Sequence, residues 1–518
     1  MVFSRWMIAI ALIATGSPIT GRAAEPILQT QITWEREFRP IYLSRTSYPR
    51  VARLSDGILL ATFANSTPER RAIGCVFSRD GGKMWGNYRQ VLEQNKPVDL
   101  DNAFPLQLPD GTILVAYRHH TPDHNYRIDV HASIDGGEHW AFRGTIATGY
   151  DGLWEPFLLL LPKGVVQAYY ASEEDCKPDQ RIEMRNSSDG GKTWGSPVTV
   201  AQKRGSRDGM PGVVRLDKEE LLVVFEAQDD PPYRFVIRGV HSGDNGRTWA
   251  TTRELIYRPR NPVRICWAAG APSIIRLPDK GLMVSFQSDE QVSYLRGDRR
   301  RDPTLPGYDY VRHTHFAYVA SYDNGRTWSG PEHLLGSSEQ PACWNELYGL
   351  NDGTILALSN YHGRIWVRTG YRTTFDITTK KPADQITVKI EQDTATFDIT
   401  SQSGIGGATV TLTEGKWPTT VLRLHLQGLE SFVASSGKIK LTGSVLSHSG
   451  NTKRLYLSED GKEGERGPGT EIKVLDAAGE PVKGLPDEGG YFEIKLPKAL
   501  LDGQPKSLEL GWIDFYRG

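Results

Sequence analysis

The sequence is poor in cysteine and methionine and carries almost no net charge. Its 518 residues include 4 cysteines and 6 methionines, and 61 basic residues face 62 acidic ones. A balanced charge gives no electrostatic argument for binding nucleic acid or an anionic membrane. The cysteines show no C-x-x-C spacing, so we expect neither a metal nor a cofactor. Cys266 and Cys343 could pair, or they could be buried free thiols.

Long apolar runs are also missing, apart from one near the N-terminus. Arg5 precedes an apolar run over residues 6–14, and small residues lead to Ala23 and Ala24. This pattern predicts a signal peptide over residues 1–23, because the run is too short to span a bilayer. We therefore expect a secreted or periplasmic protein that is a soluble monomer with no membrane association after cleavage.

An eight-residue pattern, S-x-D-x-G-x-x-W, occurs five times. The copies end at Trp85, Trp140, Trp194, Trp249 and Trp328, so the first three intervals are 55, 54 and 55 residues. A fixed period of this kind indicates a repeat architecture. Within each copy Asp and Ser hold a turn, Gly supplies a positive φ, and Trp can fill the space between neighbouring sheets. The pattern is the Asp-box, and we expect its five aspartates (80, 135, 189, 244 and 323) to be structural.

The regions around the Asp-boxes predict four short strands per repeat. Six apolar runs follow turns, of which DGILLATF (56–63) and DGTILALS (352–359) are the first and last. Another strand precedes each run, and in five cases it contains a proline. Strands between Gly-rich turns, repeated six times, predict an all-β six-bladed β-propeller over residues 25–372. The segment from Ile32 to Leu43 is expected to complete the sixth blade.

A different pattern follows the repeats. Residues 373–384 are rich in Thr and Lys and are interpreted as a linker. Beyond them, apolar and polar residues alternate over ITVKI (386–390) and VLRLHL (421–426), which predicts a C-terminal β-sandwich over residues 385–518. Trp417 and Trp512 are either sugar-stacking platforms or, as we prefer, core residues.

Aligning the repeats brings two carboxylates to one level. The residues just before the first-strand prolines are Tyr48, Phe104, Glu155, Met210 and Ala271. The corresponding ends of the second strands are Ala64, Arg118, Tyr170, Glu226, Gln287 and Asn360. Glu155 and Glu226 thus come from adjacent blades. Two carboxylates facing one cavity can hydrolyse a glycoside, one as acid and the other as nucleophile or base. Alternatively, Glu226 forms a salt bridge with Arg118 or Arg207.

Four segments resemble a known enzyme family: LWEPFLLLLP, YYASEEDCKPDQRIEMRNSSDGGKTWG, SRDGMPGVVRL and LLVVFEAQ. The repeats resemble sialidase-like propellers, and these segments are similar to the retaining exo-α-L-arabinanases of glycoside hydrolase family 93. The resemblance implies that Glu155 and Glu226 are catalytic and that Arg207 and Asp208 line the same cleft. We assign Glu155 as acid/base, because its apolar neighbours raise a carboxyl pKa, and Glu226 as nucleophile.

Further polar and aromatic residues are candidates for contact with an oligo- or polysaccharide. These are Tyr48, Arg50, Asp101, Asn102, Arg118, Trp154, Tyr170 and Gln287. An exo-sialidase is the alternative enzyme, but sialidases hold their substrate's carboxylate with three arginines, the first in an R-I-P motif. This chain has Ser47-Tyr48-Pro49 there, with Arg50 after the proline. A non-catalytic carbohydrate-binding propeller is the third possibility.

Overall fold

The computed structural model describes residues 27–278, 280–337, 340–379, 385–391, 394–401, 406–426, 440–446, 452–458, 471–475, 480, 491–496 and 507–512. The predicted signal peptide lies outside these residues. The chain divides into two compact units, one over Thr33–Arg372 and one over Met1–Ile32 with Thr373–Gly518. Among the described residues, no helix has the length and apolar character to cross a membrane.

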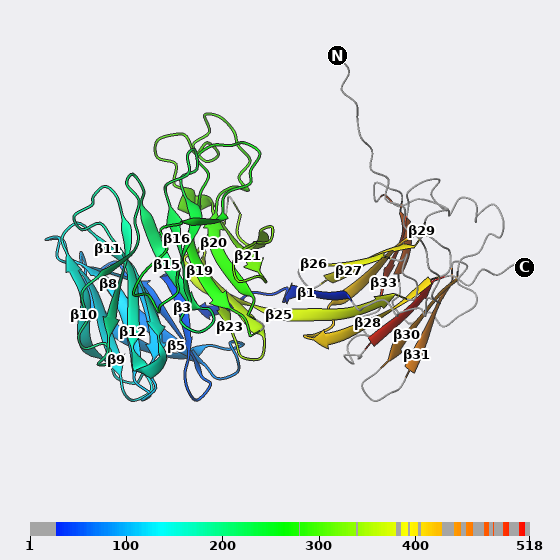
Figure 1. The fold of residues 1–518 in the computed structure, drawn as a ribbon, viewed down its shortest axis with the longest axis horizontal. Helices are drawn as coiled ribbons and strands as arrows, with labels where there is room; N and C mark the ends of the chain where they lie inside the picture. Colours follow the sequence, from blue (N-terminus) through cyan, green and yellow to red (C-terminus); the bar gives the residue numbers. More distant parts are fainter. Residues whose placement is uncertain are drawn as a thin grey trace, which may run out of the picture. The chain divides into compact units, whose positions relative to one another are not determined.

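The Thr33–Arg372 unit is all-β and consists of six antiparallel sheets (Figure 1). The first sheet is β3 (Thr46–Arg53), β4 (Leu59–Ser66), β5 (Arg70–Ser78) and β6 (Gly86–Asn95). The second is β7 (Asp99–Gln107), β8 (Ile113–His120), β9 (Tyr126–Ser133) and β10 (Ala141–Gly149). The third is β11 (Leu153–Leu160), β12 (Val166–Ser172), β13 (Arg181–Ser187) and β14 (Val198–Ala201).

The remaining three sheets follow the same order. The fourth is β15 (Asp208–Arg215), β16 (Leu221–Ala227), β17 (Val236–Ser242) and β18 (Glu254–Tyr257). The fifth is β19 (Ala269–Arg276), β20 (Leu282–Ser288), β21 (His315–Ser321) and β22 (Glu332–Leu335). The sixth is β23 (Ala342–Gly349), β24 (Thr354–Tyr361), the first part of β25 (Arg364–Thr379) and β2 (Arg39–Tyr42). Two short 3₁₀ helices, η1 (Pro162–Gly164) and η2 (Tyr310–His313), interrupt the strands.

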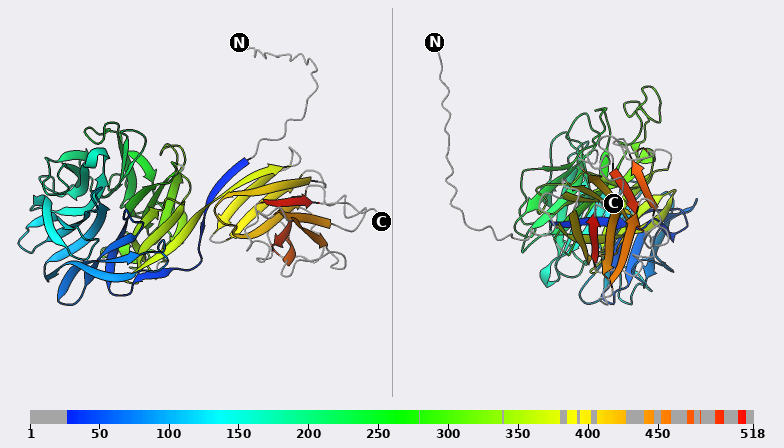
Figure 2. Two further views of the ribbon diagram at one scale, coloured as in Figure 1. Left: turned by 90° about the horizontal axis from the view of Figure 1, so that it is seen from below. Right: turned by 90° about the vertical axis from the view of Figure 1, so that its right-hand side faces the viewer.

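The first strands of successive sheets contact one another, and β23 contacts β3, so the series closes on itself. In Figure 2 the colour of this unit runs from blue through green and returns in yellow-green beside the blue strands. Strand β2 pairs with β25 through Arg39 and Val367, which confirms that the segment before the repeats completes the last sheet. Repeated four-stranded antiparallel sheets are typical of a β-propeller.

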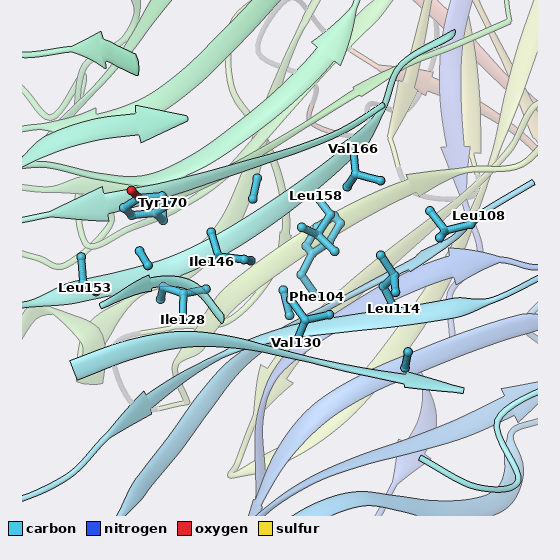
Figure 3. Close-up of a cluster of buried hydrophobic side chains, with 14 residues drawn as sticks. Phe104, Leu108, Leu114, Ile128, Val130, Ile146, Leu153, Leu158, Val166 and Tyr170 are labelled. Carbon is cyan, nitrogen blue, oxygen red and sulfur yellow. The ribbon is translucent and has the colours of Figure 1, made fainter. Parts of the chain in front are cut away.

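Apolar side chains of adjacent sheets fill the space between them. The cluster between the second and third sheets includes Phe104, Leu114, Leu158 and Val166 (Figure 3). The ring centroids of Phe104 and Phe157 lie 4.2 Å apart. Because neighbouring sheets cover both faces, second strands such as β16 are nearly continuous apolar runs.

The Asp-boxes hold the outer turns of these sheets. In the third sheet, Ser187 donates to Asp189 at 2.8 Å, and Asp189 accepts from the backbone N–H groups of Lys192 and Thr193 at 3.0 Å each. The glycines touch the preceding sheet: a Cβ on Gly137 would lie 2.7 Å from Phe77. The motif therefore fixes a turn and packs it against the neighbouring sheet.

The second unit contains two sheets. One comprises the end of β25, β28 (Gly406–Glu414), β34 (Ser507–Trp512), β30 (Lys440–Leu446) and β31 (Thr452–Ser458), with β1 (Ile27–Trp34) also on β25. The other comprises β26 (Gln385–Glu391), β27 (Thr394–Ser401), β29 (Thr419–Leu426), β33 (Tyr491–Lys495) and β32 (Glu471–Leu475). Phe375 of the first sheet packs on Phe397 of the second, with ring centroids 5.2 Å apart. Trp417 is buried against Phe375, as a core residue would be.

Two sequence interpretations need correction or completion. Residues 373–379 are not a linker, because they continue strand β25 and pair with β28. Phe375 and Ile377 are fully buried on either side of Asp376 and are flanked by threonines, so this stretch has the period-two pattern and β-branched content of a strand. All four cysteines, including Cys266 and Cys343, are free thiols.

Candidate active site

Every first strand of the six sheets has an irregularity at the same level. The register shifts there, as in a β-bulge, and one residue adopts a left-handed backbone. These residues are Tyr48 (φ 58°), Asn102 (57°), Glu155 (40°), Met210 (54°), Ala271 (49°) and Trp344 (51°). Tyr48, Met210, Ala271 and Trp344 pack into one cluster although they come from four sheets. The bulges therefore mark the level at which the sheets converge.

The structure corrects the alignment in the second sheet. Proline marks the position correctly for Tyr48, Glu155, Met210 and Ala271, but the second sheet places Asn102 there instead of Phe104. Phe104 belongs to the hydrophobic cluster of Figure 3. Trp344 is the sixth member, in a strand without a proline at that point.

The second strands show the same level, with one further correction. Ala64, Arg118, Glu226, Gln287 and Asn360 each pair with the residue before the bulge. In the third sheet this partner is Ala171, paired with Trp154, and not Tyr170. A slip of one residue turns a strand side chain to the other face. Tyr170 accordingly lies in the hydrophobic cluster of Figure 3, and its hydroxyl donates to Glu183 at 2.8 Å.

Glu155 and Glu226 line a common cavity of about 190 Å³. The full lining consists of Trp154, Glu155, Gln180, Arg207, Gly209, Glu226 and Phe235. Glu155 projects from the bulge of β11, and Glu226 from the end of β16 in the next sheet. The two carboxylates that the repeats align thus face one space.

Glu155 is placed to carry a proton. Burial, followed by the negative charge of Glu226, raises the pKa of Glu155 to about 8, although Arg118 opposes the shift. Its Oε2 atom is buried and accepts no hydrogen bond from the described residues. A carboxyl group that is protonated near neutral pH, with an oxygen unused by the protein, can donate to a ligand.

Glu226 has partners that favour its ionised form. The backbone N–H of Ala271 donates to its Oε2 at 2.7 Å. Burial raises the pKa of Glu226 to about 7, while Ala271 and the charge of Arg207 lower it. Arg118 and Arg207 form ion pairs with Asp99 and Glu173, which takes the place of the salt bridge to Glu226 that the sequence left open.

One buried carboxylate connects two residues of the cavity wall. Oε1 of Glu173 accepts from Nη2 of Arg207 at 2.6 Å and from Nε1 of Trp154 at 3.0 Å. Arg207 also donates to Gln180 at 2.7 Å. The indole and the guanidinium are therefore fixed beside the two glutamates.

A second group of charged residues, Arg118 with Asp99 and Asp101, lies near Glu155. Arg118 is bonded to Asp99 at 2.6 Å and lies 3.8 Å from Asp101, and its guanidinium is 5.0 Å from the Trp154 ring. Ser47 donates to Asp101 at 3.4 Å. The charges of Arg118 and Asp101 both act on Glu155, while Asn102 is the bulge residue that follows Asp101.

Two other candidates, Arg50 and Asp208, are held away from the cavity. Arg50 is buried and donates to the carbonyls of Pro49 and Trp344. Asp208 is fully buried in a paired contact with Arg253, at 2.6 and 2.8 Å. Its neighbour Arg207 faces the cavity because successive strand side chains point to opposite faces.

Tyr48 and Gln287 occupy the bulge level without lining the cavity. Tyr48 lies against Arg50, with the guanidinium 3.9 Å from its ring centroid. Gln287 accepts from the backbone N–H of Trp344 at 2.8 Å and donates to Tyr310 at 3.4 Å. Both contact neighbours of the glutamates.

Sequence reasoning missed Gln180, Phe235 and Tyr310. Gln180 and Phe235 lie in loops and join the neighbouring sheet through single bridges, Gln180 to Arg207 and Phe235 to Ala268. Tyr310 belongs to the insertion between β20 and β21, where the repeat alignment has no counterpart. The interval from Trp249 to Trp328 is longer than the other Asp-box intervals, and this was the sequence signal for the insertion.

Comparisons with known proteins agree with the repeat assignment. Residues 42–294 match the family described as BNR repeat-like domain. A comparison with curated proteins gives no match. Similar solved structures include a GH93 α-L-arabinofuranosidase of Fusarium graminearum with arabinobiose (20% identity, 65% of this chain and 97% of that one, TM-score 0.49).

Two further structures are similar over a comparable share of the chain. One is a Penicillium chrysogenum α-L-arabinanase complexed with arabinobiose (22% identity, 66% of this chain and 98% of that one, TM-score 0.47). The other is the Hadza microbial sialidase Hz136 (15% identity, 64% and 68%, TM-score 0.47). The match to the BNR repeat-like domain confirms the predicted Asp-box repeats.

Proposed function

We propose that this protein is a secreted or periplasmic exo-acting glycoside hydrolase, a six-bladed propeller with a C-terminal β-sandwich, that acts on α-L-arabinosyl linkages with retention of configuration. The observation that supports this most is the cavity shared by Glu155 and Glu226. Both carboxyl pKa values are raised toward neutrality, by burial first. Such groups are costly to keep among apolar strands, and they are the machinery that glycoside cleavage requires.

In this proposal Glu155 protonates the leaving oxygen and Glu226 attacks the anomeric carbon. Glu155 has the higher pKa and an unused oxygen, which suits a general acid. Glu226, bonded by Ala271 and near Arg207, is the easier to ionise, which suits a nucleophile. Water would then release the sugar, with Glu155 as base. Retention requires the two carboxyl groups to be about 5–5.5 Å apart.

The contacts of the arginines favour a neutral sugar over a sialic acid. Arg50, nearest to the expected position of a sialidase arginine, is buried on backbone carbonyls. Arg207 is the arginine of the cavity lining, and Glu173 already pairs with its charge. A clamp for a substrate carboxylate would need guanidinium groups that are free to pair.

Product analysis tests this function directly. Purified protein is incubated with linear arabinan, an aryl α-L-arabinofuranoside and sialyl-lactose, beside the variant Glu155→Gln. We expect release of short arabinosyl products from arabinan and of arabinose from the aryl glycoside, and loss of the release from arabinan in the variant. Cleavage of sialyl-lactose alone would establish the sialidase alternative. Sugar binding without cleavage of any of the three would establish a binding propeller.

A further inference from the structure

The insertion between β20 and β21 is anchored by one buried carboxylate. Asp289, directly after β20, is fully buried. It accepts from the backbone N–H of Ala268 at 2.8 Å and from the hydroxyl of Tyr308 at 3.0 Å. Ala268 immediately precedes β19, the strand whose Ala271 donates to Glu226. The far end of the insertion is therefore tied to the backbone that holds Glu226.

This anchoring places Tyr310 beside Glu226. Gly270 has no side chain, and this leaves room for both residues. A Cβ on Gly270 would lie 2.5 Å from Oε2 of Glu226 and 3.3 Å from the hydroxyl of Tyr310. Both oxygen atoms thus lie over the same Cα. The ring of Tyr310 also packs near Phe235 of the cavity wall, with centroids 6.0 Å apart.

The Tyr310 hydroxyl is oriented by its neighbours. Oε1 of Gln287 accepts from the backbone N–H of Trp344, which turns the amide nitrogen toward Tyr310, where it donates at 3.4 Å. A hydroxyl that accepts from Gln287 keeps its own proton for another acceptor. Burial, and then the charge of Glu226, hold the pKa of Tyr310 well above its ordinary value, so it remains a donor at working pH.

We propose that Tyr310 is a positioning residue for Glu226, and that the insertion over residues 289–313 supplies it. The hydroxyl lies over the same Cα as the Glu226 carboxylate and keeps its proton, so in this proposal it donates to that carboxylate, favours its ionised form and limits its rotation. A hydrogen bond to a charged form lowers the pKa of a carboxyl group. The proposal rests on the proposed role of Glu226, but it concerns an ionisation that can be measured without turnover.

The test is a titration of Glu226 in the full-length protein by difference infrared spectroscopy, with Glu226→Gln identifying its carboxyl band. We expect Tyr310→Phe to raise the pKa of Glu226 by about one unit. The matched control, Tyr294→Phe, removes a hydroxyl from the same insertion and should leave the band unchanged. Asp289→Asn weakens the anchor and should shift the Glu226 band in the same direction as Tyr310→Phe. If Tyr310→Phe does not fold, Asp289→Asn provides the test in its place.

Kinetics provide the second measurement. In Tyr310→Phe the acid limb of the pH profile of kcat/KM should move upward by the same amount, toward the alkaline limb set by Glu155, so that the pH range of activity narrows. An unchanged carboxyl band and an unchanged limb would overturn the proposal. So would complete inactivity of Tyr310→Phe together with a sugar trapped on Tyr310 in the unmodified protein, since Tyr310 would then be the nucleophile. If the unmodified protein cleaves no glycoside, the proposed function fails, and the infrared titration still decides the role of Tyr310.

Discussion

Nε1 of Trp154 donates to Oε1 of Glu173 at 3.0 Å, and the same oxygen accepts from Arg207. A single buried carboxylate therefore fixes an aromatic face and a cation in the wall that also contains Glu155 and Glu226. The position of the cation matters because its charge acts on Glu226.

Removal of that cation should change the acid side of the pH profile. Arg207→Ala takes away a charge that lowers the pKa of Glu226, so ionisation of Glu226 should require a higher pH. We expect the acid limb of kcat/KM to move upward by roughly half a unit to one unit. Arg204→Ala, in the same loop, is the control and should not move it. A downward shift in Arg207→Ala would contradict the electrostatic argument.

With the proposed activity, the unmodified protein should have its pH optimum near neutral or slightly alkaline pH. Activity should rise as Glu226 loses its proton, near its pKa of about 7, and fall as Glu155 loses its proton, near about 8. The measurement is kcat/KM on an aryl arabinofuranoside across pH 5–10 (~0.5-unit steps resolve both limbs). An optimum well below neutrality would show that the two groups titrate in other surroundings.

The two glutamates should respond differently to an added nucleophile. On an arabinofuranoside with a good leaving group, Glu155→Ala should retain the first chemical step, and azide should restore turnover with a retained glycosyl azide as product. Glu226→Ala should be inactive, and azide should give at most the inverted product. On unactivated arabinan, loss of the acid should cost on the order of 10²–10⁴ in rate. The reverse behaviour of the two variants would exchange their roles.

An Asp-box aspartate should matter for stability and not for rate. Asp189→Ala removes an acceptor of four hydrogen bonds, from Ser187, Lys192 and Thr193. We expect a loss of about 1–2 kcal/mol in the free energy of unfolding, with the rate per folded molecule unchanged. These bonds hold the pKa of Asp189 well below its ordinary value, led by the Thr193 side chain. The difference in unfolding free energy between the two proteins should therefore have its full size above the ordinary aspartate pKa. It should shrink as the pH falls through the lowered pKa of Asp189 in the folded protein.

Thermal or denaturant unfolding at several pH values measures this loss. Lys192→Ala is the control, since it changes the same turn but leaves every backbone donor to Asp189 in place. A lower rate per folded molecule at unchanged stability would show that Asp189 belongs to the active site after all.

Much of the repeat unit could be predicted from the sequence, because each repeat carries the same local signals. The turn residues of the Asp-box and the apolar runs located the strands, and the proline after the bulge located Glu155. The proline signal fails where the bulge is made without it, at Asn102 and Trp344. The register at Tyr170 also could not be predicted, since strand pairing decides which of two adjacent residues faces the cavity.

The unpredicted parts of the candidate site come from segments outside the repeat. Phe235 lines the cavity and Tyr310 lies beside Glu226, and both come from connections whose length differs between sheets, so no internal comparison can align them. Tyr310 depends on a buried Asp289 that is tied to Ala268, a contact between segments about twenty residues apart. The threonine-rich stretch that follows Arg372 was misinterpreted for another reason: its composition is typical of a linker, while its alternation of buried Phe375 and Ile377 is typical of a strand.

The pairing of β2 with β25 has a consequence for how the protein is made. Arg39 and Val367 are joined across more than three hundred residues of intervening chain, so the sixth sheet lacks its outer strand until nearly all of that chain has been synthesised. Contacts of such long separation form slowly, and an unpaired strand edge can join another chain in the meantime. Biosynthesis therefore exposes a vulnerable intermediate, and deletion of residues 39–42 would make that exposure permanent.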